Sequence, residues 1–183
     1  MRPLQRMQVI WAALFSTVGV YLVVLLSMRG QMAATQPPAQ EMVWALAAAA
    51  LGSFVASVLL PRSLHQRAAR AAAAQLATRS AFSEQVPGIE GLRDAPRARQ
   101  VFADPEAARD RAHQLAFTPM ILACALRESV VLYGFVLGFL GHPPVVWAPF
   151  FAVGALGLAA LAPTEARVLD GFARATGVGF AQG

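Results

Sequence analysis

The sequence predicts an all-α, polytopic membrane protein: a four-helix transmembrane bundle with a cytoplasmic loop that contains helical segments. Hydrophobic residues make up 57% of the 183-residue chain and charged residues 14%, against about 45–50% and about 25% in soluble domains. Four apolar segments come close to or exceed the length that crosses about 30 Å of hydrocarbon. Arginines gather in the segments that this topology places on one side of the membrane.

The first two predicted spans cover residues 8–28 and 42–60, and neither contains a charge. The first span is longer than the apolar region of a signal peptide, which has about 7–15 residues, so we expect an uncleaved membrane helix. The second span is rich in alanine. We expect it to end at Pro61, because proline disfavours the continuation of a helix.

Residues 61–115 form a long polar loop. Its first part is rich in alanine and arginine and predicts a helix, whereas the turn-forming residues over 86–99 predict an open loop. Nothing in 80–103 resembles a packed element. Asp104, Pro105 and Glu106 predict a helix start, with a cap, a proline in the first turn and an acidic residue. We expect that helix to run straight into the third span.

Residues 116–140 and 145–162 form the third and fourth spans, and the third is the only span with charges in its middle. The C-terminal tail, 163–183, places the apolar residues Val168, Leu169 and Phe172 on one helical face. This face predicts a short helix lying in the membrane interface. All 183 residues are thereby assigned to a single membrane domain.

The distribution of arginines predicts the orientation. Residues 1–7, 61–115 and 163–183 carry 2, 9 and 2 arginines, whereas 29–41 and 141–144 carry 1 and 0. The positive-inside rule therefore places both termini and the long loop in the cytoplasm. Arginine without lysine, together with abundant alanine, indicates a bacterial sequence and hence the inner (cytoplasmic) membrane. The net charge of +5 follows from this topology and calls for no nucleic-acid partner.

Arg127 and Glu128 are the candidate site, because they lie at the middle of the third span. A charge at that depth costs about 2.5–3.5 kcal/mol on insertion scales, so each must pair, face the bundle interior or line water. Neighbouring residues on a helix point about 100° apart, so each can seek a partner on another helix. Ser129 and Tyr133 can extend a polar track, and Ser16, Thr17, Ser53 and Ser57 are polar groups on the first two spans.

Two interpretations of this pair stay open. In the first, Arg127 and Glu128 are a structural pair, and the protein is a non-enzymatic structural or accessory subunit of a membrane complex. In the second, Glu128 is a proton or ion carrier tuned by Arg127, and the protein is a small ion-coupled transporter or proteolipid-like carrier. We expect the partners to be the lipid bilayer and either further copies of the chain or other membrane subunits.

Small residues predict where the helices pack, because membrane helices associate through close contact of small side chains. Gly134 and Gly138 follow nearly the face of Arg127 on the third span. Stripes of small residues at three- and four-residue spacing occur on the other spans: Ala12, Ser16 and Gly19; Ala45, Ala49, Gly52 and Ala56; Ala148, Ala152, Ala155, Ala159 and Ala162. We expect helix contacts at Gly134, Gly138, Gly52, Ala155 and Ala159.

The segment ESVVLYGFVLGFL, residues 128–140, resembles the carboxylate helix of the rotary ATPase proteolipid, subunit c. The resemblance implies that Glu128 matches the ion-carrying carboxylate, and that Tyr133 and Gly134 match the Tyr-Gly that follows it. The dense glycine repeat of the proteolipid's first helix is missing here, and an arginine precedes the carboxylate. The overall layout is similar to uncharacterised small four-span bacterial membrane proteins whose third helix carries an element like ACALRES, residues 123–129.

The sequence predicts no metal site and no cofactor. His65, His113 and His142 all lie outside the spans, where we expect solvated side chains, and no metal-ligand spacing occurs. Cys124 is expected to be an inert apolar residue. Phosphate-binding loops, nucleophile elbows and paired catalytic carboxylates are absent from the sequence.

Overall fold

A computed structural model describes residues 3–32, 40–76, 78–81 and 99–180. The chain divides into two compact units. The first comprises Met1–Ser63 and Phe117–Pro163, and the second comprises Leu64–Ala116 and Thr164–Gly183. The sequence analysis treats the chain as one domain, whereas the fold gathers the polar segments that flank the spans into a unit of their own.

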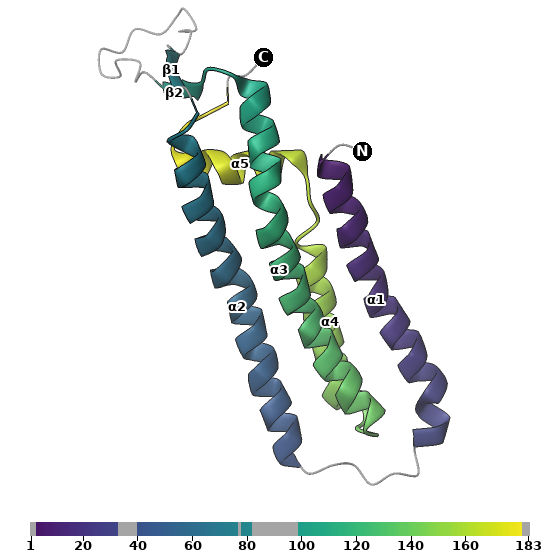
Figure 1. Cartoon of the computed structure of the whole chain (residues 1–183). Coiled ribbons are helices and arrows are strands. Elements are labelled where there is room, and N and C mark those ends of the chain that lie inside the picture. The colour runs from purple at the N-terminus through teal and green to yellow at the C-terminus, as the bar shows by residue number, and fades with distance from the viewer. Residues whose placement is uncertain (1–2, 33–39, 77, 82–98, 181–183) are drawn as a thin grey trace, which may run out of the picture. The chain divides into compact units, whose positions relative to one another are not determined.

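The first unit is built from helices (Figure 1). It contains α1 (Pro3–Met32), the first part of α2 (Gln40–Ala73), the second part of α3 (Pro105–Phe139), and α4 (Pro144–Ala159). The prediction that the chain is mainly helical is confirmed.

The two longest helices run without interruption through segments that change from apolar to polar. The predicted start of α3 is confirmed: Asp104 Oδ1 accepts hydrogen bonds at 3.0 Å from the backbone N–H groups of Glu106 and Ala107. The predicted end of the second helix at Pro61 is wrong, because α2 continues to Ala73 with Pro61 buried inside it. A proline removes one backbone donor, and the strong helix formers that follow Pro61 sustain the rest of the helix.

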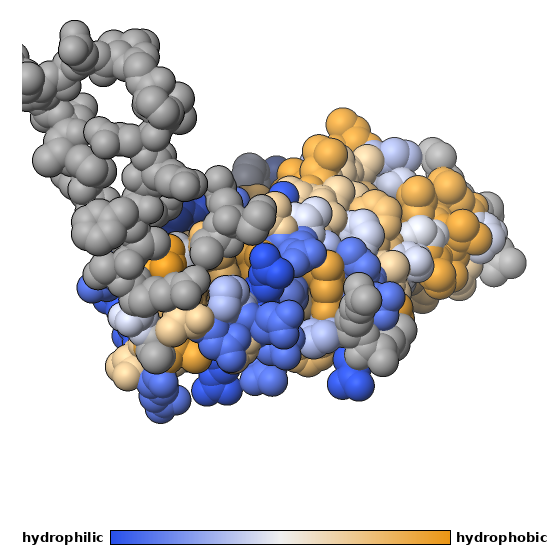
Figure 2. Space-filling model, turned by 90° about the horizontal axis from the view of Figure 1, so that it is seen from above, coloured by the Kyte–Doolittle hydropathy of each residue, from blue (hydrophilic) through white to orange (hydrophobic). Residues whose placement is uncertain are grey.

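Three helices are long and apolar enough to cross a membrane: α1, α2 and α3. The fourth predicted span corresponds to α4, which is apolar but has only 16 residues. Many large apolar side chains lie on the outer surface, including Val23, Trp44 and Leu51, each about two-thirds exposed. In Figure 2, orange marks hydrophobic residues on the surface. An apolar exterior is what a lipid solvent requires of a membrane helix.

The second unit contains a packed element that the sequence analysis placed in an unstructured loop. Strands β1 (Thr78–Ala81) and β2 (Arg99–Phe102) pair antiparallel, and Val101 forms an isolated bridge with Gly179 near the C-terminus. Phe102 is 1% exposed, and its ring centroid lies 5.5 Å from that of Phe172. The expectation of no packed element in 80–103 is therefore wrong at both ends of that segment, where β1 and β2 pair; residues 82–98 lie outside the described residues.

The tail forms α5 (Glu165–Thr176), as the apolar face of the sequence predicts. Thr164 caps its N-terminus by accepting a hydrogen bond from Arg167 N, and Gly177 ends it with φ 74°, a left-handed conformation that favours glycine. Val168 and Phe172 are buried within the second unit, where the rings of Phe102 and Phe180 lie near Phe172. These two side chains are therefore buried in the protein, whereas the sequence analysis expected them to face the membrane interface.

Candidate mid-membrane polar site

Arg127 lies near the middle of the membrane-spanning part of α3 and is half-buried. Its Nε donates a hydrogen bond to Ser57 Oγ on α2 at 3.3 Å, and its Nη1 donates to the carbonyl oxygen of Gly157 on α4. The guanidinium carbon also lies 5.6 Å from the ring centroid of Phe54 on α2, within the range of a cation–π contact. Arg127 thus connects α3 to two other helices.

Glu128 makes its contacts with α1. Its Oε1 lies 2.7 Å from Thr17 Oγ1 and 3.4 Å from the Tyr21 hydroxyl. The ring centroid of Phe135 on α3 lies 5.4 Å from that of Tyr21. Glu128 thus connects α3 to α1, whereas the hydrogen bonds of Arg127 run to α2 and α4.

The two central residues therefore bond to different helices. Among the described residues, the hydrogen bonds of Arg127 run to α2 and α4, and those of Glu128 run to α1. This follows from helix geometry, because consecutive residues diverge by about 100°. Together the two side chains link α3 to each of its neighbours at one level of the first unit.

Only part of the predicted polar track forms. The hydroxyl of Tyr133 lies 3.5 Å from Ser53 Oγ on α2 and continues the polar contacts between α2 and α3. Ser129 instead donates to the carbonyl of Ala125 on its own helix, and Ser16 donates to Ala12 in the same way. Such bonds satisfy the hydroxyl within its own helix and make no contact between helices.

Glycines bring α3 close to its neighbours. A Cβ added to Gly134 would lie 2.7 Å from Phe150 Cβ on α4, and one added to Gly138 would lie 2.6 Å from Leu25 Cδ2 on α1. The structure therefore brings both predicted packing glycines into close helix contacts.

The small residues that were expected to pack on the second and fourth spans do not lie at close helix contacts. Gly52 has no heavy atom within 4 Å of an added Cβ, Ala159 is exposed, and Ala155 is only half-buried. The closest approach of α4 uses Gly154 and Gly157 instead. The sequence analysis missed this pair, although they are the only glycines of the fourth span and lie three residues apart, on one helical face.

Gly157 and Arg127 fit each other closely. A Cβ on Gly157 would lie 3.1 Å from Arg127 Cδ and 3.4 Å from Phe54 Cε2. The missing side chain lets the stem of Arg127 lie against α4, and the carbonyl of the same residue accepts the Nη1 bond. The backbone carbonyl of Gly157 and the absence of a side chain at this position thus both shape the site.

The remaining candidate residues do not assemble into a metal site. Within the described residues, no group of three or more His, Cys, Asp and Glu side chains is placed to hold a metal ion. Cys124 is buried and free. His113, expected at a solvated surface, is 9% exposed, and its Nδ1 lies 2.8 Å from the carbonyl of Arg109. That expectation is wrong, because α3 begins well before the third span and carries His113 into the packed second unit.

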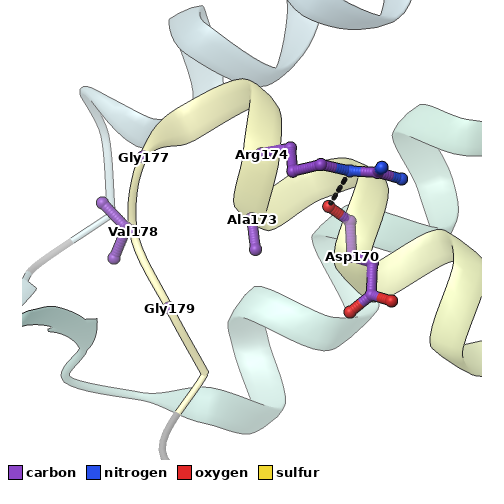
Figure 3. Close-up of a pocket in the computed structure, with 6 residues that line it drawn as sticks. All are labelled: Asp170, Ala173, Arg174, Gly177, Val178 and Gly179. Atoms are coloured by element: carbon purple, nitrogen blue, oxygen red, sulfur yellow. Dashed lines mark hydrogen bonds between the residues drawn. The ribbon is translucent and has the colours of Figure 1, made fainter.

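Two hollows lie outside this cluster. One has a volume of about 390 Å³ and lies beside the C-terminal end of α5 (Figure 3). There Arg174 Nε donates to the carbonyl of Asp170 at 3.2 Å. The other, about 270 Å³ in volume, is almost wholly apolar and lies among α2, α3 and α4 beside Phe54 and Phe150. Neither is lined by Arg127 or Glu128.

Comparison with known proteins places the chain in no family: no family model, no curated protein and no solved structure matches it.

Proposed function

We propose that this chain is a non-enzymatic integral membrane protein that acts as a structural or accessory subunit of a membrane complex. The observation that carries the proposal is the use of the two mid-membrane charged residues as links between helices. Arg127 bonds to α2 and α4, and Glu128 bonds to α1. Polar groups in a membrane that are all engaged in helix contacts stabilise a bundle.

In this proposal α4 is a fourth span, and residues 163–183 return to the cytoplasm. α4 contains no charged residue, and Trp11 Nε1 on α1 donates a hydrogen bond at 2.8 Å to the carbonyl of Leu158. These contacts support a place for α4 inside the bundle. The arginine distribution supports an orientation with both termini in the cytoplasm of a bacterial inner membrane. The lipid bilayer, together with further copies or other membrane subunits, remains the proposed set of partners.

The experiment compares Arg127→Met and Glu128→Leu with the unmodified chain, reconstituted in vesicles and tested for folded yield and for proton and sodium flux. We expect both variants to lose folded protein, because each leaves hydrogen-bonding groups unpaired in the bundle. We expect no ion flux from the unmodified chain. Flux that disappears in a well-folded Glu128 variant would overturn the structural proposal.

A second candidate function is that of a proteolipid-like or small ion-coupled transporter with Glu128 as carrier. It is favoured by one observation: Glu128 lies within hydrogen-bonding distance of two hydroxyl groups, those of Thr17 and Tyr21. Hydroxyls can stabilise either form of a carboxyl group. The flux measurement on the unmodified chain decides between the two functions.

A further inference from the structure

The apolar hollow among α2, α3 and α4 opens at the outer surface of the first unit. Its lining includes the buried Val130 of α3, together with Leu51 of α2 and Val153 of α4, which are exposed. The hollow has a volume of about 270 Å³. Pockets that enclose a whole small molecule are slightly larger, about 300–1,000 Å³. The hollow therefore fits part of an apolar chain.

A positive charge lies on the same side of α2 as the hollow. Arg62 is exposed and directly follows Pro61, beyond the apolar residues 42–60. It comes eleven residues after Leu51. Because each residue turns a helix by about 100°, these two side chains point about 20° apart and lie about 16 Å apart along the axis. That length is close to half of the hydrocarbon core, which is about 30 Å thick.

A second guanidinium lies near Arg62. The charges of Arg62 and Arg127 are close enough to repel each other. Arg127 donates its hydrogen bonds to a hydroxyl and a backbone carbonyl, and its guanidinium lies over the ring of Phe54, which also lines the hollow. Among the described residues, neither arginine forms an ion pair with a carboxylate. An anion beside the hollow would compensate these charges.

We propose that this side of the first unit binds one anionic phospholipid, with its phosphate at Arg62 and one acyl chain extending along α2 into the hollow. Basic sites at the membrane surface bind anionic headgroups, and a hydrocarbon chain matches a hollow lined by apolar side chains. The spacing of Arg62 and Leu51 matches the depth that a chain reaches within one leaflet. This site goes beyond the proposed function and does not depend on it, since a structural subunit and an ion carrier can both hold a lipid.

The experiment is native mass spectrometry of the full chain, released from micelles that contain equal amounts of phosphatidylglycerol and phosphatidylcholine with the same acyl chains. We expect one bound phosphatidylglycerol per chain, in preference to phosphatidylcholine. Arg62→Gln should lower this preference about fivefold, because a basic residue near the membrane surface contributes about 1 kcal/mol to anionic lipid binding.

Arg67→Gln is the matched control for the charge. It removes an exposed arginine five residues further along α2, on a side of the helix about 140° away from Arg62. The preference for phosphatidylglycerol should survive in this variant. Equal binding of the two lipids to the unmodified chain, or equal losses in the two arginine variants, would overturn the proposal.

The acyl-chain part of the site has its own test. Ala47→Phe fills the hollow and should lower the binding of both lipids, whereas Ala48→Phe, at an exposed position outside the hollow, should not. Glycerol phosphate, which carries the charge without the chains, should not displace the lipid. Displacement by glycerol phosphate, or unchanged lipid binding in Ala47→Phe, would overturn the proposal. A dimer without bound lipid that is lost in Ala47→Phe would also overturn it, because a second copy would then fill the hollow.

Discussion

Gly154 is the position where a single added carbon tests the packing of the bundle most severely. A Cβ there would overlap Val131 Cγ2 on α3 and would lie 3.2 Å from both Arg127 O and Val131 N. Two of these three atoms belong to the backbone of α3. Side-chain rotation cannot relieve these two contacts, and the closest overlap is with Val131, a β-branched side chain that has one strongly preferred rotamer in a helix. Gly154→Ala therefore strains the contact between α3 and α4.

The expected change in the free energy of unfolding for Gly154→Ala is the balance of two opposing effects. Overpacking costs about 1–3 kcal/mol, and replacing glycine by alanine inside a helix returns about 0.5–1 kcal/mol. We expect Gly154→Ala to lower the free energy of unfolding by up to about 2.5 kcal/mol. Gly52→Ala is the matched control, because its added Cβ meets no heavy atom within 4 Å. It should leave stability unchanged or raise it.

The assay is unfolding of the purified full chain in mixed micelles with increasing denaturing detergent. Adding Val131→Ala to Gly154→Ala should recover part of the loss, because the side-chain atom closest to the added carbon is then removed. A Gly154→Ala protein as stable as Gly52→Ala would refute the close approach of α3 and α4.

Three further predictions concern other parts of the chain. Arg127→Lys keeps the charge but cannot reproduce the two bonds of the guanidinium, so it should destabilise the bundle by about 1.5–3 kcal/mol in the same assay; unchanged stability would contradict the linking role. Phe102→Ala should destabilise the second unit by about 3–5 kcal/mol and expose the C-terminal tail to protease. If protease cuts the tail of this variant no faster than that of the unmodified chain, the ring of Phe102 is not a core residue. With Cys124 replaced by alanine, cysteines introduced at 36 and 90 should be labelled from the periplasmic and the cytoplasmic side respectively, whereas labelling of both from one side would disprove the crossing of α2.

Hydropathy and capping predicted the helices well, because both depend on residues close together in sequence. The start of α3 at Asp104 and Pro105 is such a case. Pro61 was misjudged as a helix end, since the missing donor affects only one bond and the next twelve residues still favour a helix. Strand β2 was missed because its partners, β1 and Gly179, lie about twenty and eighty residues away in sequence.

The site was predictable in its residues but not in its bonds. Arg127 and Glu128 are identified from the sequence alone, because they are charged residues inside an otherwise uncharged apolar segment. Which helix each side chain meets depends on how the four helices are rotated about their axes, and alanine stripes on several faces gave no single answer. Gly134 on α3 and Gly154 on α4 favour one rotation, because at both positions an added Cβ would lie 3.0–3.2 Å from backbone atoms of the facing helix.

A double-mutant cycle on Arg127→Met and Glu128→Leu tests the central claim most directly. If the two side chains fasten α3 to different helices, each change removes separate hydrogen bonds, so the double variant should be less stable than either single variant. If they instead form a pair with each other, removing both charges together should restore stability that each single change loses. A double variant more stable than either single variant would contradict the account.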